Sequence, residues 1–260
     1  MIPPYVDQAW LAAHPEAVVA DVRWYLDGRS GRLEFGKGHL PGAVFVDLDN
    51  VLAAPPSPAG GRHPLPDPEV FAAGMRAAGI SDDSVVVAYD DDAGANASRL
   101  VWLLRVTGHD AALLDGGITG WQGELSTDPT KPGPGTFTAS PWPTELLVEI
   151  DELDDVLVDA RAAERFRGEV EPIDARPGHI PGAVSLPCRQ NVGPDGRLLP
   201  DDELRGRFAA VDGAWISYCG SGVTACQNLL VAEHLGLPRG RLYSGSYSQW
   251  AATTRPVETG

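Results

Sequence analysis

The segment at residues 215–230, WISYCGSGVTACQNLL, contains the parts of a strand–loop–helix unit. Its first four residues are aromatic, β-branched or small, which is typical of a strand buried on both faces of a parallel sheet. A short Gly/Ser-rich loop follows, and then an apolar run of helical character. Cys219 comes directly after the predicted strand, and ligands bind at the carboxyl ends of strands in open α/β sheets. The segment therefore predicts an α/β fold with a cysteine at its functional edge.

Four blocks of sequence occur twice in the same order, which indicates a duplicated domain. They are VVADVR (18–23) and VLVDAR (156–161), GHLPGAVFVDL (38–48) and GHIPGAVSLP (178–187), SVVVAYDDDAGANASRLVWLL (84–104) and AWISYCGSGVTACQNLLVAEHL (214–235), and AALLDGGITGWQ (111–122) and GRLYSGSYSQWA (240–251). Strand-like runs alternate with helical segments such as DPEVFAAGMRAAG and DDELRGRFAAV, so each copy is predicted to be an open, mostly parallel sheet flanked by helices. We place the first domain at 1–125, a Pro/Gly-rich linker at 126–144 and the second domain at 145–260.

The composition excludes several classes of function. A formal net charge of −16 repels phosphate backbones and anionic membranes, so neither nucleic acid nor membrane is an expected partner. The N-terminal residues lack the basic and apolar regions of a signal peptide, and no apolar run is long enough to span a bilayer. We therefore expect a soluble, cytoplasmic protein. The chain has no CxxC and no Cys/His cluster with zinc-ligand spacing, and no metal or organic cofactor is predicted.

The loop after Cys219 has the composition of an anion-binding turn. Gly220 and Gly222 permit tight curvature, and Thr224 is a candidate cap for a helix that starts at Ala225. Amides that converge on the Cys219 sulfur, together with the helix N-terminus, would stabilise a thiolate, which is the nucleophilic form. A buried cysteine beside a turn remains the alternative. Two further cysteines have simpler interpretations: Cys226 is predicted to be a core residue, and Cys188 to be incidental.

Two chemistries use a cysteine in such a loop. Cysteine-dependent phosphatases need an arginine six residues after the nucleophile, and that position is Ala225 here. Sulfur transfer needs donors for a terminal persulfide sulfur, which backbone amides can supply. The loop therefore favours sulfur transfer.

The doubled pattern of D-[AV]-R, GH[IL]PGA, strand–loop–helix and Trp resembles the tandem-domain rhodanese-type sulfurtransferases, over about residues 5–256. The loop CGSGVTA is similar to that of the 3-mercaptopyruvate sulfurtransferases, whereas thiosulfate-preferring members carry cationic residues where this chain has Gly220 and Ser221. The resemblance implies a silent first domain and a catalytic second domain. Alignment of AYDDD with SYCGS agrees, because it places Asp90, which cannot attack sulfur as a thiolate does, opposite Cys219.

The resemblance also implies a catalytic group of Cys219, Ser221, His63 and Asp49. In this arrangement the aspartate orients the histidine, and the histidine polarises the serine hydroxyl for proton movement at the substrate. Outside the family context, His63 in its Pro-rich loop would be a solvated residue, and Asp49 could cap a helix that begins near Val51.

Substrate binding is assigned to arginines and to the loop. Arg165 matches the first carboxylate-binding arginine of the family, and its alternative is a surface arginine. The second arginine of the family falls on Ile173, and nearby Arg176 is a candidate replacement. His39 and His179 are interpreted as structural because both copies have one. The loop residues predicted to contact substrate are Gly220, Gly222, Val223 and Thr224.

The resulting prediction is a sulfurtransferase that moves sulfur from a small anionic donor, with 3-mercaptopyruvate favoured, through a Cys219 persulfide. The acceptor is expected to be a thiol, thioredoxin or cyanide. A thiosulfate sulfurtransferase with the same intermediate is the first alternative. A non-catalytic sulfur-relay or protein-binding module is the second.

Overall fold

A computed structural model describes residues 1–211 and 213–260, which form two compact units. Unit 1 comprises Met1–Ala53, Pro66–Trp142 and Val192–Leu198, and unit 2 comprises Ala54–Leu65, Pro143–Asn191 and Leu199–Gly260. The units are thus interleaved along the chain, and the segment Ala54–Leu65 belongs to unit 2 although it lies in the first sequence repeat. The boundaries at 125 and 145 stay a prediction about the repeats.

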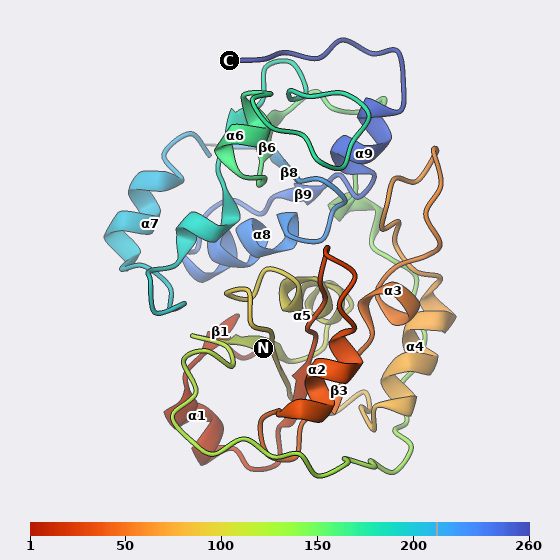
Figure 1. Ribbon diagram of the computed structural model, residues 1–260, viewed down its shortest axis with the longest axis vertical. Helices are drawn as coiled ribbons and strands as arrows, with labels where there is room; N and C mark the ends of the chain where they lie inside the picture. The colour runs from red at the N-terminus through yellow and green to blue at the C-terminus, as the bar shows by residue number, and fades with distance from the viewer. Residues whose placement is uncertain (212) are drawn as a thin grey trace. The chain divides into compact units, whose positions relative to one another are not determined.

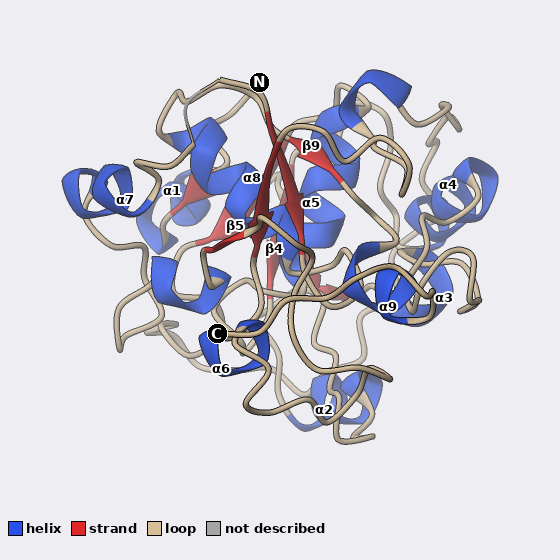
Figure 2. Ribbon diagram, turned by 90° about the horizontal axis from the view of Figure 1, so that it is seen from above, coloured by secondary structure: helices blue, strands red, loops and turns tan. Residues whose placement is uncertain are grey.

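Unit 1 is built on a parallel sheet with the strand order β1-β5-β4-β2-β3. The strands are β1 (Tyr5–Val6), β2 (Val18–Asp21), β3 (Val44–Phe45), β4 (Val86–Tyr89) and β5 (Ala111–Leu114). The helices are α1 (Gln8–Ala13), α2 (Gly31–Lys37), α3 (Leu48–Val51), α4 (Pro68–Ala77) and α5 (Ala97–Val106). Figure 2 shows α5 beside β4 and β5, against which it packs. Every residue of β4 and β5 is buried, as expected for the central strands of a covered parallel sheet.

Unit 2 repeats this plan with the strand order β7-β6-β8-β9, again parallel. The strands are β6 (Val156–Asp159), β7 (Val184–Ser185), β8 (Trp215–Tyr218) and β9 (Arg241–Leu242). The helices are α6 (Ala163–Phe166), α7 (Asp201–Arg207), α8 (Ala225–His234) and α9 (Ser246–Ala251), with 3-10 turns η1 (Thr144–Leu146) and η2 (Cys188–Asn191). In Figure 1, α8 lies alongside β8 and β9, and it packs on both.

The predicted fold class is confirmed. The order β5-β4-β2-β3 in unit 1 corresponds to β9-β8-β6-β7 in unit 2, so the duplication read from the sequence is a duplication of topology. The runs VVAD, VLVD and WISY coincide with β2, β6 and β8. The helix predicted at DPEVFAAGMRAAG is α4, which Asp67 caps and Pro68 begins. The second helical run ends at Arg207, earlier than its apolar pattern suggests.

A buried ion pair lies at the end of β2 in unit 1 and at the end of β6 in unit 2. In unit 2, Asp159 and Arg161 have side chains that are 0% and 1% exposed, and Arg161 Nη2 donates to Asp159 Oδ2 at 2.7 Å. The same nitrogen donates to the Gly178 carbonyl at 2.7 Å, and the guanidinium stacks 3.8 Å from the centre of the Tyr247 ring. Asp21 and Arg23 repeat the pair in unit 1, with the Gly38 carbonyl as acceptor. The D-[AV]-R motif therefore fixes the position of the Gly-His-[Ile/Leu]-Pro-Gly turn in both units.

The histidines of that turn have structural surroundings. His39 stacks on Phe35 and His179 on Phe166, with ring centroids 3.9 Å and 3.6 Å apart. Each histidine Nδ1 lies within hydrogen-bond distance of the carbonyl of that same phenylalanine. Within residues 1–211 and 213–260, no helix has the length and hydrophobicity needed to cross a membrane.

We expect Arg161→Met to lower the free energy of unfolding by about 3–5 kcal/mol, because it leaves the Asp159 carboxylate buried without its cation. Urea unfolding followed by near-UV circular dichroism measures this change. Arg167→Ala is the matched control, since Arg167 pairs with Glu169 on the surface and its loss should leave the midpoint nearly unchanged. Equal effects of the two substitutions would contradict the structural role of the buried pair.

Candidate functional site

Cys219 is the first residue after β8, at the carboxyl edge of the unit 2 sheet. Tyr218 pairs with Asp159 of β6 in parallel register, so both strands end at this edge. The helix α8 begins at Ala225, as predicted, and leaves residues 219–224 as a tight loop between strand and helix. The strand and the helix are both buried, which places the loop on a rigid support.

The loop amides point at the cysteine sulfur. The Gly222 amide donates to Cys219 Sγ at 3.1 Å, and the Ser221 amide donates to it at 3.4 Å. Gly222 has φ 78°, and a Cβ there would lie 2.5 Å from the Ser244 carbonyl oxygen, so this turn requires glycine. Amide donors next to a sulfur favour its negatively charged form. The predicted anion-binding geometry is present around Cys219.

The start of α9 holds the loop from its other side. Ser246 Oγ accepts from the Cys219 amide at 3.2 Å, and the Tyr247 amide donates to the Cys219 carbonyl at 3.0 Å. The Ser248 amide donates to the Gly220 carbonyl at 2.9 Å. Ser246 itself has φ 54°, a conformation that non-glycine residues seldom adopt and that persists when its surroundings enforce it. These bonds fix the position of the Cys219 main chain.

The remaining loop predictions have mixed outcomes. Thr224 occupies the N-cap position of α8, but in the described part of the chain its side chain makes no capping hydrogen bond, so the predicted side-chain cap is wrong. Val223 is buried beside it. Cys226 is fully buried, and its thiol donates to the Gly222 carbonyl, which confirms it as a core residue. Cys188 is buried in η2.

Ser221 and His63 form a hydrogen-bonded pair. The distance from His63 Nδ1 to Ser221 Oγ is 2.8 Å, and each residue is 7% exposed. His63 comes from the unit 2 segment Ala54–Leu65, whose ends are tied together by the hydrogen bond from the Ala54 amide to the Pro64 carbonyl. The alternative of a solvated histidine is therefore wrong. A buried imidazole that is hydrogen-bonded to the Ser221 hydroxyl, two residues after Cys219, is suited to transfer a proton near the Cys219 sulfur.

Asp49 lies in unit 1, on α3, and its carboxylate accepts from Trp24 Nε1 at 2.9 Å and 3.0 Å. The alternative in which Asp49 caps a helix near Val51 is wrong, because α3 begins at Leu48 and Asp47 caps it. The pairing of Asp49 with His63 stays a prediction.

Arg165 is held by buried carboxylates rather than exposed. Its Nη2 donates to Glu171 Oε1 at 2.7 Å and to Asp174 Oδ2 at 3.0 Å, and its side chain is 17% exposed. The alternative of a surface arginine therefore does not describe it.

Arg176 has different partners. Its three guanidinium nitrogens donate to the carbonyls of Ala251, Arg255 and Trp250, so it braces the C-terminal segment, and substrate binding by Arg176 stays a prediction.

The two carboxylates at Arg165 respond differently to burial. Burial disfavours the charged form of Glu171, but hydrogen bonds from Arg165 and from the Asp174 and Ile173 amides outweigh it and lower its pKa. Burial dominates at Asp174 and raises its pKa, despite the nearby cations of Arg62 and Arg165. The cluster thus holds two cationic groups and at least one firmly ionised carboxylate.

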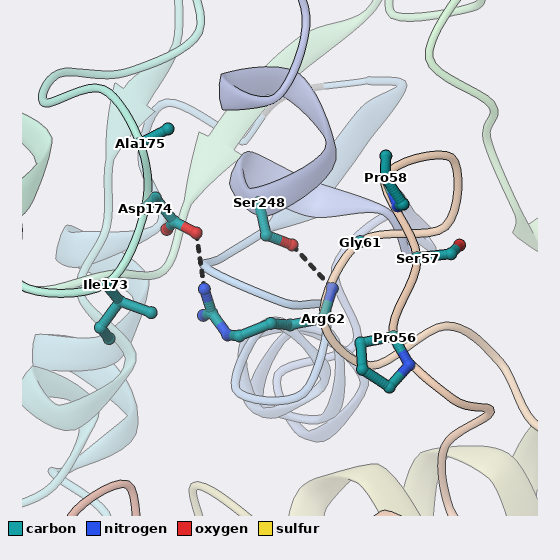
Figure 3. Close-up of a pocket in the computed structure, with 9 residues that line it drawn as sticks. All are labelled: Pro56, Ser57, Pro58, Gly61, Arg62, Ile173, Asp174, Ala175 and Ser248. Atoms are coloured by element: carbon teal, nitrogen blue, oxygen red, sulfur yellow. Dashed lines mark hydrogen bonds and ion pairs between the residues drawn. The ribbon is translucent and has the colours of Figure 1, made fainter.

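Arg62 is a site residue that the sequence analysis missed. Its Nη1 donates to Asp174 Oδ1 at 2.6 Å, and its amide donates to Ser248 Oγ at 3.0 Å; Figure 3 shows the side chain extending from its loop toward Asp174. A Cβ on Gly220 would lie 2.7 Å from Arg62 Nη2 and 3.4 Å from Arg165 Nη1, so both guanidinium groups reach the residue after Cys219. The one feature of the sequence that points to Arg62 is its position immediately before His63 in GGRHPLP.

Unit 1 carries Asp90 where unit 2 carries Cys219. Asp90 directly follows β4 and is 0% exposed. Its carboxylate accepts hydrogen bonds from loop and helix amides, namely those of Asp92, Gly94, Asn96 and Ala97, at 2.7–2.9 Å. Burial raises the pKa of Asp90 to about 6, and these amides only partly offset it. The first repeat therefore keeps the amide-lined turn but fills it with a carboxylate.

Comparison with known proteins agrees with this architecture. The model of the rhodanese-like domain matches residues 7–124 and 143–253. With both parallel α/β units and the cysteine loop in place, the chain belongs to the tandem-domain, rhodanese-type sulfurtransferases.

Individual relatives are similar over nearly the whole chain. A probable 3-mercaptopyruvate sulfurtransferase of Pseudomonas aeruginosa is 43% identical, over 95% of this chain and 94% of its own. The 3-mercaptopyruvate sulfurtransferase of Escherichia coli is 37% identical over 98% and 97%. A putative thiosulfate sulfurtransferase of Mycobacterium tuberculosis is also 37% identical, over 93% and 90%. The crystal structure of the E. coli enzyme superposes with a TM-score of 0.82 at 35% identity, covering 95% of this chain and all of that one.

The raised pKa of Asp90 predicts a pH dependence of unit 1 stability. Between about pH 4 and about pH 6 the folded chain retains a proton on Asp90 that the unfolded chain has released, so the free energy of unfolding falls as the pH rises. Asp90→Asn removes this contribution. Unfolding curves across this range should therefore have a less negative slope with pH in the variant, whatever its absolute stability. Identical slopes for the two proteins would contradict the assignment.

Gly222→Ala should remove the amide donors from the Cys219 sulfur, because the added Cβ cannot approach the Ser244 carbonyl as closely as the turn demands. We expect sulfur loading of Cys219, followed by mass spectrometry of the intact protein after treatment with a sulfur donor, to slow by at least about tenfold. Gly236→Ala is the matched control. Gly236 also has positive φ, 65°, but a Cβ there meets no described atom within 4 Å. Equal slowing in both variants would point to backbone strain in general.

Proposed function

We propose that the protein transfers sulfur from a small anionic donor, with 3-mercaptopyruvate favoured, to a thiol or cyanide acceptor through a persulfide on Cys219. The observation that carries the proposal is the donation of the Ser221 and Gly222 amides to Cys219 Sγ, at 3.4 Å and 3.1 Å. These donors stabilise a thiolate before the reaction and the charged terminal sulfur of a persulfide after it.

The first half-reaction forms the persulfide. The Cys219 thiolate attacks the thiol sulfur of mercaptopyruvate, a sulfur–sulfur bond forms, and the carbon–sulfur bond breaks with its electron pair left on carbon. The product is the enolate of pyruvate, which takes up a proton. His63 and Ser221 are positioned to move that proton, since Nδ1 and Oγ are 2.8 Å apart beside the sulfur.

The second half-reaction returns the enzyme to its resting state. A thiolate acceptor attacks the terminal sulfur, takes it as a new persulfide, and leaves Cys219 as the thiolate, so the overall reaction follows double-displacement kinetics. Cyanide would accept the same sulfur as thiocyanate. Thioredoxin is an acceptor of the same chemical kind, a protein thiol.

The donor preference is supported by Ser221. Its hydroxyl is hydrogen-bonded to the buried His63, and such a pair can deliver the proton that the pyruvate enolate needs on carbon. Thiosulfate releases sulfite, and that reaction has no proton transfer to carbon. The named 3-mercaptopyruvate sulfurtransferases of P. aeruginosa and E. coli support the same choice. The putative thiosulfate sulfurtransferase of M. tuberculosis keeps thiosulfate as the second candidate donor. The silence of the first repeat is supported by Asp90, whose carboxylate occupies the position of the nucleophile.

The test compares steady-state turnover of two sulfur donors, mercaptopyruvate and thiosulfate, with the same thiol as acceptor in both assays. The wild type should prefer mercaptopyruvate, and Ser221→Ala should lower kcat with mercaptopyruvate by about 10²–10⁴-fold while changing turnover with thiosulfate far less. Cys219→Ser should abolish both reactions, and Cys226→Ser should preserve both. A wild-type preference for thiosulfate would overturn the proposed donor, and full activity of Cys219→Ser would overturn the persulfide. Absence of turnover with either donor would favour the relay module.

A further inference from the structure

The guanidinium groups of Arg62 and Arg165 converge beside the nucleophile loop from different segments of unit 2. A Cβ on Gly220 would meet Arg62 Nη2 at 2.7 Å and Arg165 Nη1 at 3.4 Å. The absence of a side chain at residue 220 thus leaves the space next to Cys219 to two positive charges from elsewhere in the fold. Both arginines are paired in turn with acidic side chains, Arg62 with Asp174 and Arg165 with Glu171 and Asp174.

The spacing of the two guanidinium groups suits one carboxylate. Asp174 demonstrates this, because its Oδ1 accepts from Arg62 Nη1 at 2.6 Å and its Oδ2 accepts from Arg165 Nη2 at 3.0 Å. Asp174 is itself buried, with a side chain that is 4% exposed. Paired N–H donors in this arrangement are the usual means of recognising a carboxylate.

Arg62 also retains donor capacity. Its Nε is buried and has no hydrogen-bond partner among residues 1–211 and 213–260. The side chain lines a cavity of about 320 Å³ together with Ile173, Asp174 and Ser248 (Figure 3). Ser248 joins this cavity to the cysteine loop, because its amide donates to the Gly220 carbonyl. A small anion in the cavity would therefore lie against Arg62, and Ser248 is the lining residue that is bonded to the loop.

Ile173 borders the same cavity. The family resemblance puts a carboxylate-binding arginine at this position, and an isoleucine side chain has no donor to offer. Arg62 faces Asp174, the next residue in the chain, from the opposite segment. A guanidinium group therefore lies next to position 173, but Arg62 supplies it from a distant part of the sequence.

We propose that Arg62 binds the carboxylate of the sulfur donor jointly with Arg165, in place of the arginine that the family resemblance puts at position 173. This inference rests on the proposed function and names a residue that selects α-keto acid donors over donors without a carboxylate. Asp174 keeps the two guanidinium groups oriented while the site is empty.

The test measures kcat and KM for Arg62→Ala with mercaptopyruvate and with mercaptoacetone, which keeps the thiol and the ketone but lacks the carboxylate. KM for mercaptopyruvate should rise by about 10- to 100-fold, the loss expected for a hydrogen bond between charged groups. KM for mercaptoacetone should stay within about twofold of the wild type. Arg167→Ala, which removes an exposed arginine paired with Glu169, should change neither value.

This pair of donors separates binding from support of the neighbouring His63. If Arg62 served only to hold the loop, its loss would displace His63 and lower kcat with both donors alike, and that outcome would overturn the proposal. The double variant Arg62→Ala/Ile173→Arg returns a guanidinium to the position named by the resemblance. It should recover at least part of the affinity for mercaptopyruvate. If it recovers none, Arg62 does not supply the guanidinium that the family resemblance puts at position 173.

Failure of this inference and failure of the proposed function give different results. A wild type that does not turn over mercaptopyruvate contradicts the function itself. A wild type that does so, with an Arg62→Ala variant of unchanged KM, contradicts the role of Arg62 alone.

Discussion

The buried ion pair between Asp159 and Arg161 is the interaction on which the site in unit 2 depends. It lies at the end of β6, which pairs with the end of β8, and through Gly178 it holds the turn that precedes β7. Arg161 also stacks on Tyr247, whose amide binds the Cys219 carbonyl. A pair with almost no exposure to water thus connects the sheet edge, the turn and α9 to the nucleophile. Rigid support of this kind is what keeps amide donors aligned with one sulfur atom.

The two repeats show that the amide-lined turn and the reactive atom are separable. Unit 1 keeps the buried pair as Asp21 and Arg23, and its turn donates amides to the Asp90 carboxylate. Unit 2 offers amides to Cys219 in the corresponding place. The turn directs amide donors at the side chain that follows the central strand in both units, and that side chain is a carboxylate in unit 1 and a thiol in unit 2.

The sequence was sufficient for the fold because its signals are local or repeated. Strands such as WISY are short apolar runs, and the duplicated order of motifs carries the topology. The pairing of Ser221 with His63 was also predictable, but only through the family resemblance, since 158 positions separate them in the chain. Arg62 was missed because its role depends on which segment packs against Asp174, and no periodicity in GGRHPLP encodes that contact. The Thr224 cap failed for a similar reason, as composition marks the helix start without fixing the hydroxyl rotamer.

The interleaving of the chain has a practical meaning for dissecting this protein. The strip Ala54–Leu65 is folded with unit 2, although most of the sequence around it is folded with unit 1. A recombinant fragment cut at the repeat boundary would carry Cys219 and its loop yet lack the imidazole and the guanidinium that this strip contributes. The first sequence repeat therefore contributes an imidazole and a guanidinium to the unit that contains Cys219, so the two repeats cannot be separated by one cut without dividing unit 2.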